Sequence, residues 1–462
     1  MTLWTAADAA AATGGRTSGD WAATGLSIDS RSVAAGDLFV ALTAARDGHD
    51  FAAAALAAGA AAVLVSRLPD GVDPARALLV EDVQAALEAL GRAGRGRSRA
   101  RVIAVTGSVG KTSTKEMLRH VLSRQGRVHA AVRSFNNHWG VPLTLAALPA
   151  EADYGVVEIG MNHPGEIAPL ARMAAPDVAL VTNVAPVHLE AFPDGLEGIA
   201  REKAAIFEGL GPDGVAIYHG GLAVTPILAR DGTVAFGPLG TEGAAWTLTE
   251  VNAGADAVTC SADTPVGELA FRIGTPGAHF ATNALAVLAA VHAVGADVAQ
   301  AALALADWTP PDGRGARHAV RLHPDAPPVD LIDDAYNANP ASVAAALELL
   351  AGTDVPRRAR RIAILGDMKE LGPTGPRLHA ALAEGDAIGA LDEVHCAGPL
   401  MRHLHDALPA DARGRWAATA AGLAPHLRDM LRPGDAVLVK GSLSMGMTAL
   451  VDGIRTLGEA EG

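Results

Sequence analysis

Hydrophobic residues occur along this chain in short runs, each followed by a longer stretch with helical spacing. In the middle of the chain, these strand-like runs are Val102–Val105, Val156–Ile159 and Val178–Val184. The helical patterns that follow them span about Lys111–Gln125, Glu166–Met173 and Leu196–Leu210. Strand–helix alternation of this kind predicts a parallel sheet with helices on both faces.

Changes in this pattern predict an α/β protein of three domains, at residues 1–98, 99–314 and 315–462. The first is a small α/β domain with an alanine-rich helical run at Phe51–Gly59. The second adds three strand-like runs between Trp246 and Ile273, which predict an antiparallel appendage. The third repeats strand–helix pairs in a doubly wound, Rossmann-like pattern.

A Gly/Arg-rich stretch at residues 91–100 lies between the first two domains. Its composition favours a solvated linker, with an RNA-binding segment as the weaker alternative. The formal net charge of −14 argues against a general affinity for nucleic acid or anionic membranes. Met1–Gly15 lacks the basic start of a signal peptide, and the apolar run Phe51–Val65 is too short to span a bilayer. Two distant cysteines suit a reducing compartment, so a cytoplasmic protein is expected.

The strongest local signal is Thr106-Gly107-Ser108-Val109-Gly110-Lys111-Thr112-Ser113, between a strand and a helix. Glycines let backbone N–H groups converge on phosphate oxygens, and the helix N-terminus adds a positive dipole. Lys111 can neutralise the β- and γ-phosphates of ATP, and the Thr112 hydroxyl can bind Mg²⁺. The alternative is a glycine turn that only caps the helix. We expect ATP to contact Gly107, Ser108, Gly110, Lys111, Thr112 and Ser113.

Three further residues are candidate metal ligands in the predicted second domain. Glu158 ends one strand-like run, His188 follows another, and Lys203 lies on a predicted helix. The carboxyl ends of parallel strands meet at one crevice, so Glu158 and His188 are expected near the phosphate loop. Each has an ordinary alternative, as a helix cap, a loop histidine and a solvated helix charge respectively.

Polar clusters in the second half of the chain are candidate substrate contacts. His279 and Asn283 are four residues apart on one helical face, although an Asn in an amphipathic helix is equally plausible on local grounds. Three loops of the third domain follow strand-like runs, at Asp333–Ser342, Gly366–Gly372 and Val439–Ser442. Doubly wound folds bind ligands at such strand ends, whereas a plain turn is the alternative for the first loop.

Together these segments resemble the Mur ligase family over nearly the whole chain and in the order of its three domains. The resemblance also rests on the sequence segments Asp29–Ser32, Gly36–Leu42, Asp47–Phe51, Asn136–Pro142, Glu158–Asn162 and Asp334–Pro340. The resemblance implies a P-loop ATPase-like central domain and an ADP-forming acid–amino-acid ligase of peptidoglycan precursor synthesis. It is strongest to members that join D-alanyl-D-alanine to UDP-N-acetylmuramoyl-tripeptide through an acyl phosphate.

Three alternatives remain open at this point. The chain could be another Mur-type ligase that adds a single amino acid, or a folylpolyglutamate-synthase-like ligase. It could also be a non-catalytic protein that senses ATP, although the set Lys111, Glu158, His188 and Lys203 argues against this.

The resemblance also implies roles for individual residues on the ATP side. Two Mg²⁺ ions are expected, with Thr112, Glu158, His188 and a carbamylated Lys203 as ligands. Asn283 and Arg314 match nucleotide contacts, and Asp334 matches a ribose contact. Lys111, His188, Lys203 and Arg314 form the expected catalytic set. Phe280 departs from the family, which often has Asn after the histidine.

The remaining expectations concern the other substrates and the assembly. Ser30 and Arg31 match the region that holds the UDP group, and the protein is expected to be a monomer. The other predicted substrate contacts are Asn136, Asn137, Asn337, Lys440 and Ser442. Lys440 offers a cation for the free carboxylate of a dipeptide, which predicts a preference for D-alanyl-D-alanine over D-alanine.

Overall fold

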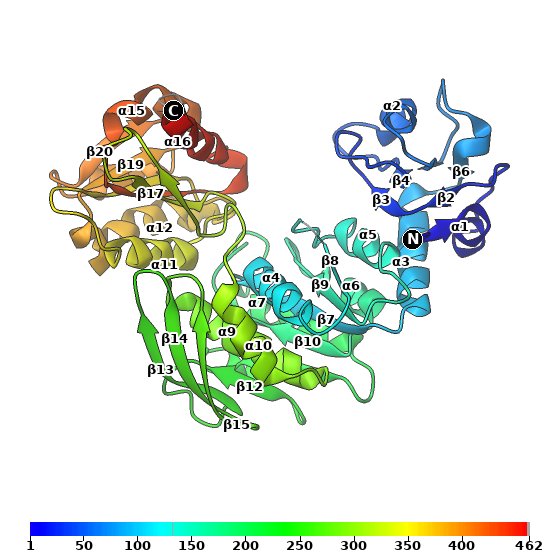
Figure 1. The fold of residues 1–462 in the computed structure, drawn as a ribbon, viewed down its shortest axis with the longest axis horizontal. Coiled ribbons are helices and arrows are strands. Elements are labelled where there is room, and N and C mark those ends of the chain that lie inside the picture. Colours follow the sequence, from blue (N-terminus) through cyan, green and yellow to red (C-terminus); the bar gives the residue numbers. More distant parts are fainter. Residues whose placement is uncertain (132, 460–462) are drawn as a thin grey trace.

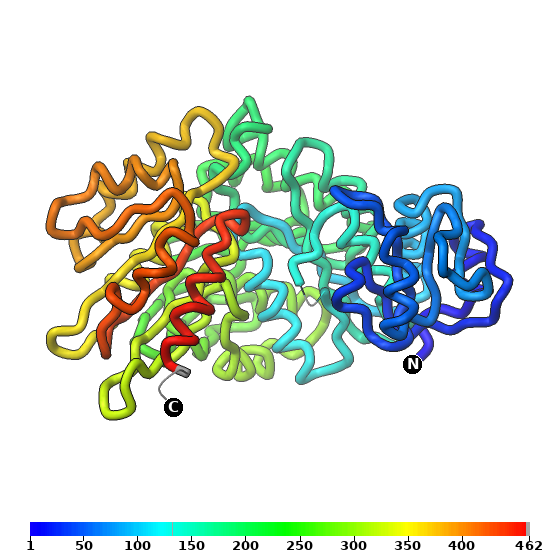
Figure 2. Tube along the Cα trace, turned by 90° about the horizontal axis from the view of Figure 1, so that it is seen from above, coloured from blue at the N-terminus to red at the C-terminus, as the bar shows by residue number. Residues whose placement is uncertain are grey.

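The computed structural model describes residues 1–131 and 133–459, and these form three lobes that each contain their own sheet (Figure 1). We name them the N-terminal, central and C-terminal lobes, with sheets of four, nine and six strands. The central lobe lies between the other two, so the N-terminal lobe occupies one end of the molecule and the C-terminal lobe the other (Figures 1 and 2).

The N-terminal lobe is built on a small parallel sheet. Its order is β3 (Gly25–Ser27), β4 (Asp37–Val40), β5 (Ala62–Val65) and β6 (Ala77–Leu79). Beside it, β1 (Trp4–Thr5) and β2 (Ala22–Ala23) form an antiparallel pair. Helices α1 (Ala6–Thr13) and α2 (Ala52–Ala57) complete the predicted α/β arrangement.

The predicted linker at 91–100 is wrong, because helix α3 (Val83–Arg97) runs through most of it. Its apolar residues pack into the core of the N-terminal lobe, and its Gly91 and Gly94 face helix α5 (Gly140–Ala146). A Cβ at Gly94 would lie 2.2 Å from the Leu145 carbonyl oxygen. Glycine therefore permits close helix packing here, and Arg95 donates hydrogen bonds to the Ala174 and Ala175 carbonyl oxygens.

The central sheet has the order β15-β14-β13-β12-β11-β10-β7-β9-β8. The strands that run parallel are β7 (Arg101–Thr106), β8 (Val128–Ala130), β9 (Tyr154–Glu158), β10 (Val178–Val181), β11 (Val215–His219), β12 (Val234–Gly237) and β13 (Trp246–Ala253). Strands β14 (Val258–Thr264) and β15 (Gly267–Ile273) continue it antiparallel. The predicted appendage is thus antiparallel, but it extends the sheet through β13.

Helices cover both faces of this sheet because each strand–helix pair crosses over it. One face packs against α4 (Lys111–Leu122), α9 (His279–Ala293) and α10 (Val298–Ala304). The other packs against α5, α6 (Ile167–Ala174), α7 (Gly195–Ala204) and α8 (Thr225–Leu228). The strands are buried on both sides, which explains their nearly continuous Val, Ile and Leu runs.

The C-terminal lobe is doubly wound, as predicted. Its sheet contains β16 (Ala316–Val320), β17 (Val329–Asp334), β21 (Ala436–Lys440), β18 (Arg361–Gly366), β19 (Glu393–Ala397) and β20 (Arg413–Ala417), in that order. Only β16 is antiparallel among these strands. One face carries α11 (Pro340–Ala351), α12 (Gly375–Ala381) and α13 (Met401–Ala407), and the other carries α14 (Ala420–Leu423), α15 (Leu427–Met430) and α16 (Thr448–Glu459).

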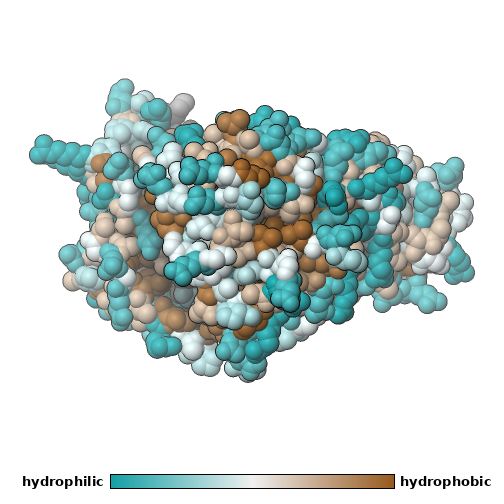
Figure 3. Space-filling model, turned by 90° about the horizontal axis from the view of Figure 1, so that it is seen from below, coloured by the Kyte–Doolittle hydropathy of each residue, from teal (hydrophilic) through white to brown (hydrophobic). Residues whose placement is uncertain are grey.

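The surface in Figure 3 is hydrophilic over much of both ends, with hydrophobic residues gathered toward the middle of that face. Among the residues described, no helix combines the length and apolar character needed to cross a membrane. The three sheets lie within the predicted domain ranges, while the boundaries at residues 98 and 314 stay predictions.

Candidate active site

The glycine-rich loop after β7 has the backbone shape that phosphate binding requires. Gly110 has a φ of 83°, in the left-handed region, and it begins helix α4. A Cβ at Gly110 would lie 2.8 Å from the Asn283 side-chain oxygen, and a Cβ at Gly107 would lie 2.0 Å from Thr182 Oγ1. Any larger residue would collide with these neighbours, so both glycines are required by close approach.

Lys111 folds back over this loop, and its Nζ donates a hydrogen bond to the Gly107 carbonyl oxygen at 2.6 Å. Burial lowers the pKa of Lys111, Glu158 opposes that shift, and Arg314 adds to it. A desolvated cation at the start of a helix would gain strongly from an anionic ligand.

A buried carboxylate, Glu158, links the loop to its surroundings at the end of β9. It accepts hydrogen bonds from Thr112 Oγ1 at 2.9 Å and from Asn136 Nδ2 at 2.7 Å. Thr112 Oγ1 lies 3.0 Å from Ser134 Oγ, which also accepts a hydrogen bond from Arg314 at 3.2 Å. The loop, the carboxylate and the C-terminal connection therefore form one polar network.

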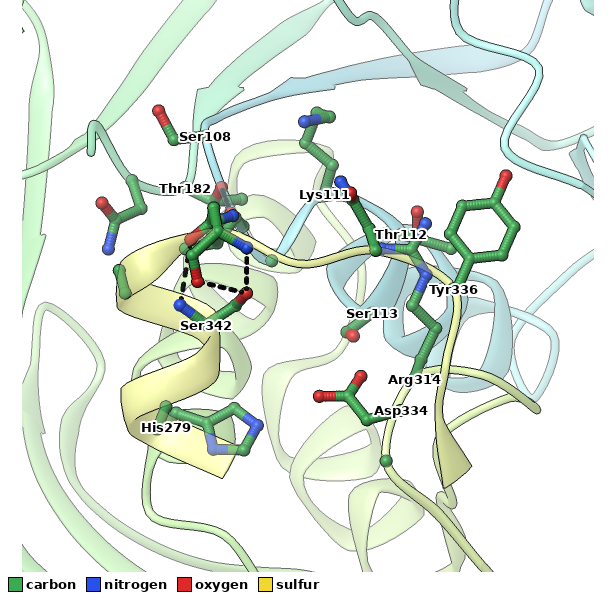
Figure 4. Close-up of a pocket in the computed structure, with 18 of the residues that line it drawn as sticks. Ser108, Lys111, Thr112, Ser113, Thr182, His279, Arg314, Asp334, Tyr336 and Ser342 are labelled. Atoms are coloured by element: carbon green, nitrogen blue, oxygen red, sulfur yellow. Dashed lines mark hydrogen bonds between the residues drawn. The ribbon is translucent and has the colours of Figure 1, made fainter. Parts of the chain in front are cut away.

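These residues line a cavity of about 510 Å³ between the central and C-terminal lobes. In Figure 4, Ser108, Lys111 and Thr112 of the central lobe share this space with Arg314, Asp334 and Tyr336. A neighbouring cavity of about 330 Å³ shares Ser108 and Lys111 with the first. Residues at the carboxyl ends of strands in both sheets thus line these cavities, which is the arrangement that the strand-end rule predicts.

His188 also lines both cavities, as does Glu370 of the C-terminal lobe. The His188 Nδ1 and Glu370 Oε2 atoms are 2.5 Å apart, which joins the two lobes directly. Both residues have left-handed backbone, with φ values of 54° and 64°. This conformation is unfavourable for residues with a Cβ, and it is held here by the surrounding structure. The hydrogen bond from His188 lowers the pKa of Glu370.

Lys203 lies on helix α7 and is only 1% exposed. Among the described residues, no hydrogen bond or ion pair of its Nζ is found. Burial lowers its pKa well below the ordinary value, and the nearby Lys111 lowers it further. The alternative of a solvated surface lysine is therefore wrong.

Three predicted substrate contacts lie at strand ends and on the following loops of the C-terminal lobe. The Asn337 side-chain oxygen accepts from the Ala338 N–H at 2.9 Å, and Ser442 Oγ accepts from the Lys369 N–H at 3.0 Å. Lys440 is 2% exposed, and its Nζ donates to Asp334 Oδ2 at 2.6 Å and to the Asn337 carbonyl oxygen at 2.9 Å. The Lys440 ammonium is thus paired within the protein, whereas the sequence predicted it as the cation that meets a dipeptide carboxylate.

The nucleotide candidates on α9 lie against the loop. Asn283 contacts Gly110 and lines the larger cavity with His279 and Phe280. Burial lowers the pKa of His279 to about 4, and Lys440 contributes, so its ring stays neutral near pH 7. Phe280 packs edge-on against Trp308, with ring centroids 5.2 Å apart, so the position that departs from the family is filled by core packing.

Other predicted contacts lie away from this cavity. Ser30 and Arg31 belong to the N-terminal lobe, where exposed Arg31 pairs with Asp29 at 2.7 Å. The Asn137 side-chain oxygen accepts from the Trp139 and Gly140 backbone N–H groups. Asn137 thus supports the start of α5 and is absent from the described lining of the cavity, although the sequence grouped it with Asn136.

The models described as Mur ligase family, catalytic domain; Mur ligase middle domain; and Mur ligase, glutamate ligase domain match residues 22–95, 105–291 and 320–443. The UDP-N-acetylmuramoyl-tripeptide–D-alanyl-D-alanine ligase of Escherichia coli (strain K12) is 35% identical over 442 residues, or 94% of each chain. The chain belongs to the Mur ligase family.

Solved Mur ligase structures have the same architecture as this Mur ligase. MurF from Acinetobacter baumannii superposes with a TM-score of 0.83 at 29% identity, covering 98% of this chain and 99% of that one. MurF ligase from Thermotoga maritima, in complex with ADP, has a TM-score of 0.75 at 26% identity, covering 94% and 98%.

Several cavity residues of this Mur ligase were missed by sequence reasoning. Thr182 and His219 lie at the ends of neighbouring parallel strands, so the strand-end rule could have identified them. Tyr336 and Glu370 lie in the strand-end loops at 333–342 and 366–372 that the sequence had indicated, although neither residue was singled out, and Ser134 carried no comparable signal. The Arg314 guanidinium lies over the Tyr336 ring at 4.1 Å, a pairing across 22 residues that no local pattern predicts.

Proposed function

We propose that this Mur ligase uses ATP to join the amine of D-alanyl-D-alanine to the carboxylate of UDP-N-acetylmuramoyl-tripeptide. The observation that carries this proposal is one cavity lined by the phosphate loop of the central lobe and by strand-end loops of the C-terminal lobe. The Escherichia coli relative, 35% identical over nearly the full length, is named for these two substrates. ATP as the phosphoryl donor is supported by the ADP complex of the Thermotoga maritima ligase.

The reaction has two steps that balance. A tripeptide carboxylate oxygen bonds to the γ-phosphorus while the bond to the β–γ bridging oxygen breaks, which gives ADP and an acyl phosphate. The dipeptide nitrogen then attacks the carbonyl carbon, inorganic phosphate leaves, and a proton is released. Lys111 and Arg314 offset the negative charge that the reacting groups bring together. The His188–Glu370 contact joins the two lobes at the site, and closure of these lobes around the substrates would limit hydrolysis of the acyl phosphate.

The oxygen ligands beside the phosphate loop fit Mg²⁺. Thr112 Oγ1 and Glu158 Oε2 lie 2.9 Å apart, and hard cations prefer oxygen ligands of this kind. We assign Thr112 to one ion, and Glu158, His188 and modified Lys203 to a second. When bound, Mg²⁺ supplies charge neutralisation at the transferring phosphoryl group.

We also propose that Lys203 carries a carbamate. Its buried Nζ has no carboxylate partner within the described part of the chain and lies near Lys111, so the neutral amine is favoured. A neutral amine can attack carbon dioxide, forming an N–C bond and releasing one proton. The product is an anion, which suits a position near the Lys111 ammonium better than a second ammonium does.

Lys369 is the better candidate for the free carboxylate of the dipeptide. It lines the smaller cavity beside Lys111 and His188, and its side chain is 39% exposed, against 2% for Lys440. Its Nζ lies 3.0 Å from the buried Asp367 Oδ2, which orients the ammonium and leaves donors free. Asn337 and Ser442 line the same cavity.

The assignment is tested by following ADP and phosphate release with purified protein. Release is expected with UDP-N-acetylmuramoyl-tripeptide plus D-alanyl-D-alanine, and a new pentapeptide product should be found by mass spectrometry. D-alanine and L-glutamate serve as alternative amine substrates. Folate, tested together with glutamate, serves as the alternative acceptor. Turnover with one of these, and none with the dipeptide, would assign the enzyme to another branch. ATP binding without turnover of any substrate would support a nucleotide sensor.

Replacing Lys369 with alanine is expected to raise KM for the dipeptide roughly tenfold, the effect of losing one charge-assisted hydrogen bond. In this variant, KM for ATP should change little.

Lys440→Ala is expected to raise KM for ATP instead, because Asp334, the predicted ribose contact, loses its partner. Steady-state kinetics with each substrate varied separately checks both. If Lys440→Ala instead raises KM for the dipeptide and Lys369→Ala raises KM for ATP, Lys440 becomes the contact for the dipeptide carboxylate.

The remaining expectations are a monomeric state and a cytoplasmic location, and both stay predictions. Ser30 and Arg31 are likewise proposed as part of the surface that holds the UDP group, at the far end of an extended substrate.

A further inference from the structure

The connection between the central and C-terminal lobes is a tight turn at residues 312–315. Gly313 and Gly315 have left-handed φ values of 75° and 95°. The Gly313 N–H donates to Asp333 Oδ2 at 2.7 Å, and the Gly315 N–H donates to the Asp333 carbonyl oxygen at 2.8 Å. These bonds attach the turn to β17, and Arg314 extends from it into the nucleotide cavity (Figure 4).

Three potential metal ligands gather at this turn, outside the residues used in the proposed reaction. Asp312 lies on the turn, His318 on the edge strand β16 and Asp333 on β17. One ligand atom from each lies within 4.8 Å of the other two. Asp333 is buried, the His318 side chain is 22% exposed, and the Asp312 side chain is 77% exposed. The most exposed ligand is therefore also the one most free to adjust.

The state of His318 Nε2 points to a missing partner. This atom is buried and has no hydrogen-bond partner within the described part of the chain. The nearest carboxylate oxygen, Asp312 Oδ1, lies 3.8 Å away, which is too far for a hydrogen bond. The His318 nitrogen is therefore left without a hydrogen bond among the described residues. A buried polar atom in this state is unfavourable.

The chemistry of the three groups suits a divalent transition-metal ion. Imidazole nitrogen with carboxylate oxygens is a donor set used for Zn²⁺, whereas Mg²⁺ prefers oxygen and water. Three protein ligands leave a position for water, as in many zinc sites. The Gly313 and Ala335 N–H groups hold the Asp333 carboxylate in place, and its other lone pairs remain available.

We propose that Asp312, His318 and Asp333 form a binding site for a divalent transition-metal ion at the connection between the two lobes. The bound ion ties the exposed side chain of Asp312 to strands β16 and β17. It thereby braces the turn that presents Arg314 to the nucleotide cavity. The site is separate from the Mg²⁺ ligands proposed at the phosphate loop.

Binding is tested on the full chain, freed of metal by a chelator and titrated with Zn²⁺ in excess Mg²⁺, by calorimetry without substrates. Wild type is expected to bind one more Zn²⁺ per chain than either Asp312→Asn or His318→Ala. His323→Ala, which removes an exposed histidine of the same lobe, is the matched control and should bind as wild type does. Asp312→Asn changes an exposed side chain only, so it keeps the test valid should His318→Ala fold poorly.

Equal Zn²⁺ stoichiometry in wild type and Asp312→Asn would overturn the site. The bracing role has its own readout, which is hydrogen exchange of the Gly313 and Gly315 amides. Zn²⁺ should slow their exchange in wild type and in His323→Ala, and leave it unchanged in Asp312→Asn. If Zn²⁺ does not change the exchange rate of these two amides in wild type, the bracing role is overturned. Neither measurement depends on ligase activity, so the proposed reaction is tested separately.

Discussion

Replacing Lys111 with alanine is expected to lower kcat by about a hundredfold or more, in line with the loss of other charge-stabilising groups. Lys111 lines the cavity, and its Nζ is desolvated and held at the Gly107 carbonyl oxygen. Negative charge gathers there when a carboxylate approaches the γ-phosphate, and the variant has no cation at that position. Coupled measurement of ADP release, with ATP and both other substrates saturating, gives kcat directly.

Arg119→Ala is the matched control for this variant, because Arg119 is an exposed cation on the same helix α4. It should retain kcat within a few-fold of wild type, and both variants should keep the wild-type circular dichroism spectrum. A Lys111→Ala enzyme that is folded and turns over within a few-fold of wild type would refute the assignment of the phosphate loop.

Lys203→Ala is expected to reduce kcat by a comparable factor, on the order of a hundredfold, because the carbamate supplies an anionic ligand in a buried position. Short carboxylates such as acetate can occupy the space left by the side chain. Added acetate should therefore restore part of the activity, whereas chloride at equal ionic strength should not. Turnover measured across a series of acetate concentrations checks this expectation.

The control for rescue is Arg201→Ala, which removes an exposed charge from the same helix α7. This variant should be active without acetate and should not respond to it. Mass analysis of the intact wild-type protein in bicarbonate should show the added mass of one carbamate. Full activity of Lys203→Ala, or a defect that no carboxylate relieves, would contradict the carbamate and leave Lys203 with a structural role.

Much of the fold could be predicted because its signals are local. Buried parallel strands such as β7 and β10 are continuous apolar runs, and the helices after them begin where the pattern changes. The Gly/Arg-rich stretch was interpreted wrongly for the opposite reason. Gly94 is indistinguishable from a flexible linker residue until α5 is placed against it, at a distance that excludes a Cβ.

Some residues of the candidate site could be predicted from their sequence neighbours, whereas the roles of others depend on partners distant in the chain. The phosphate loop is a contiguous segment with its own chemistry, so Lys111 and Thr112 could be assigned directly. Lys440 was expected to meet the dipeptide carboxylate, whereas its Nζ donates to Asp334, a partner 106 residues earlier in the chain that no local pattern indicates. Asn137 follows Asn136 directly, yet Asn136 reaches Glu158 while Asn137 bonds to the backbone at the start of α5. Neighbours in sequence can thus differ entirely in role.

By itself, the sequence determined the succession of strands and helices, the phosphate loop and the family resemblance, because each depends on the order of neighbouring residues. Only the tertiary structure decided which charges are free and which are paired. It paired Lys440 with Asp334, joined His188 to Glu370 across two lobes, and left buried Lys203 without a partner among the described residues. The physical reason is that desolvation and Coulomb interaction depend on distance in space, and folding brings these groups together from distant parts of the chain.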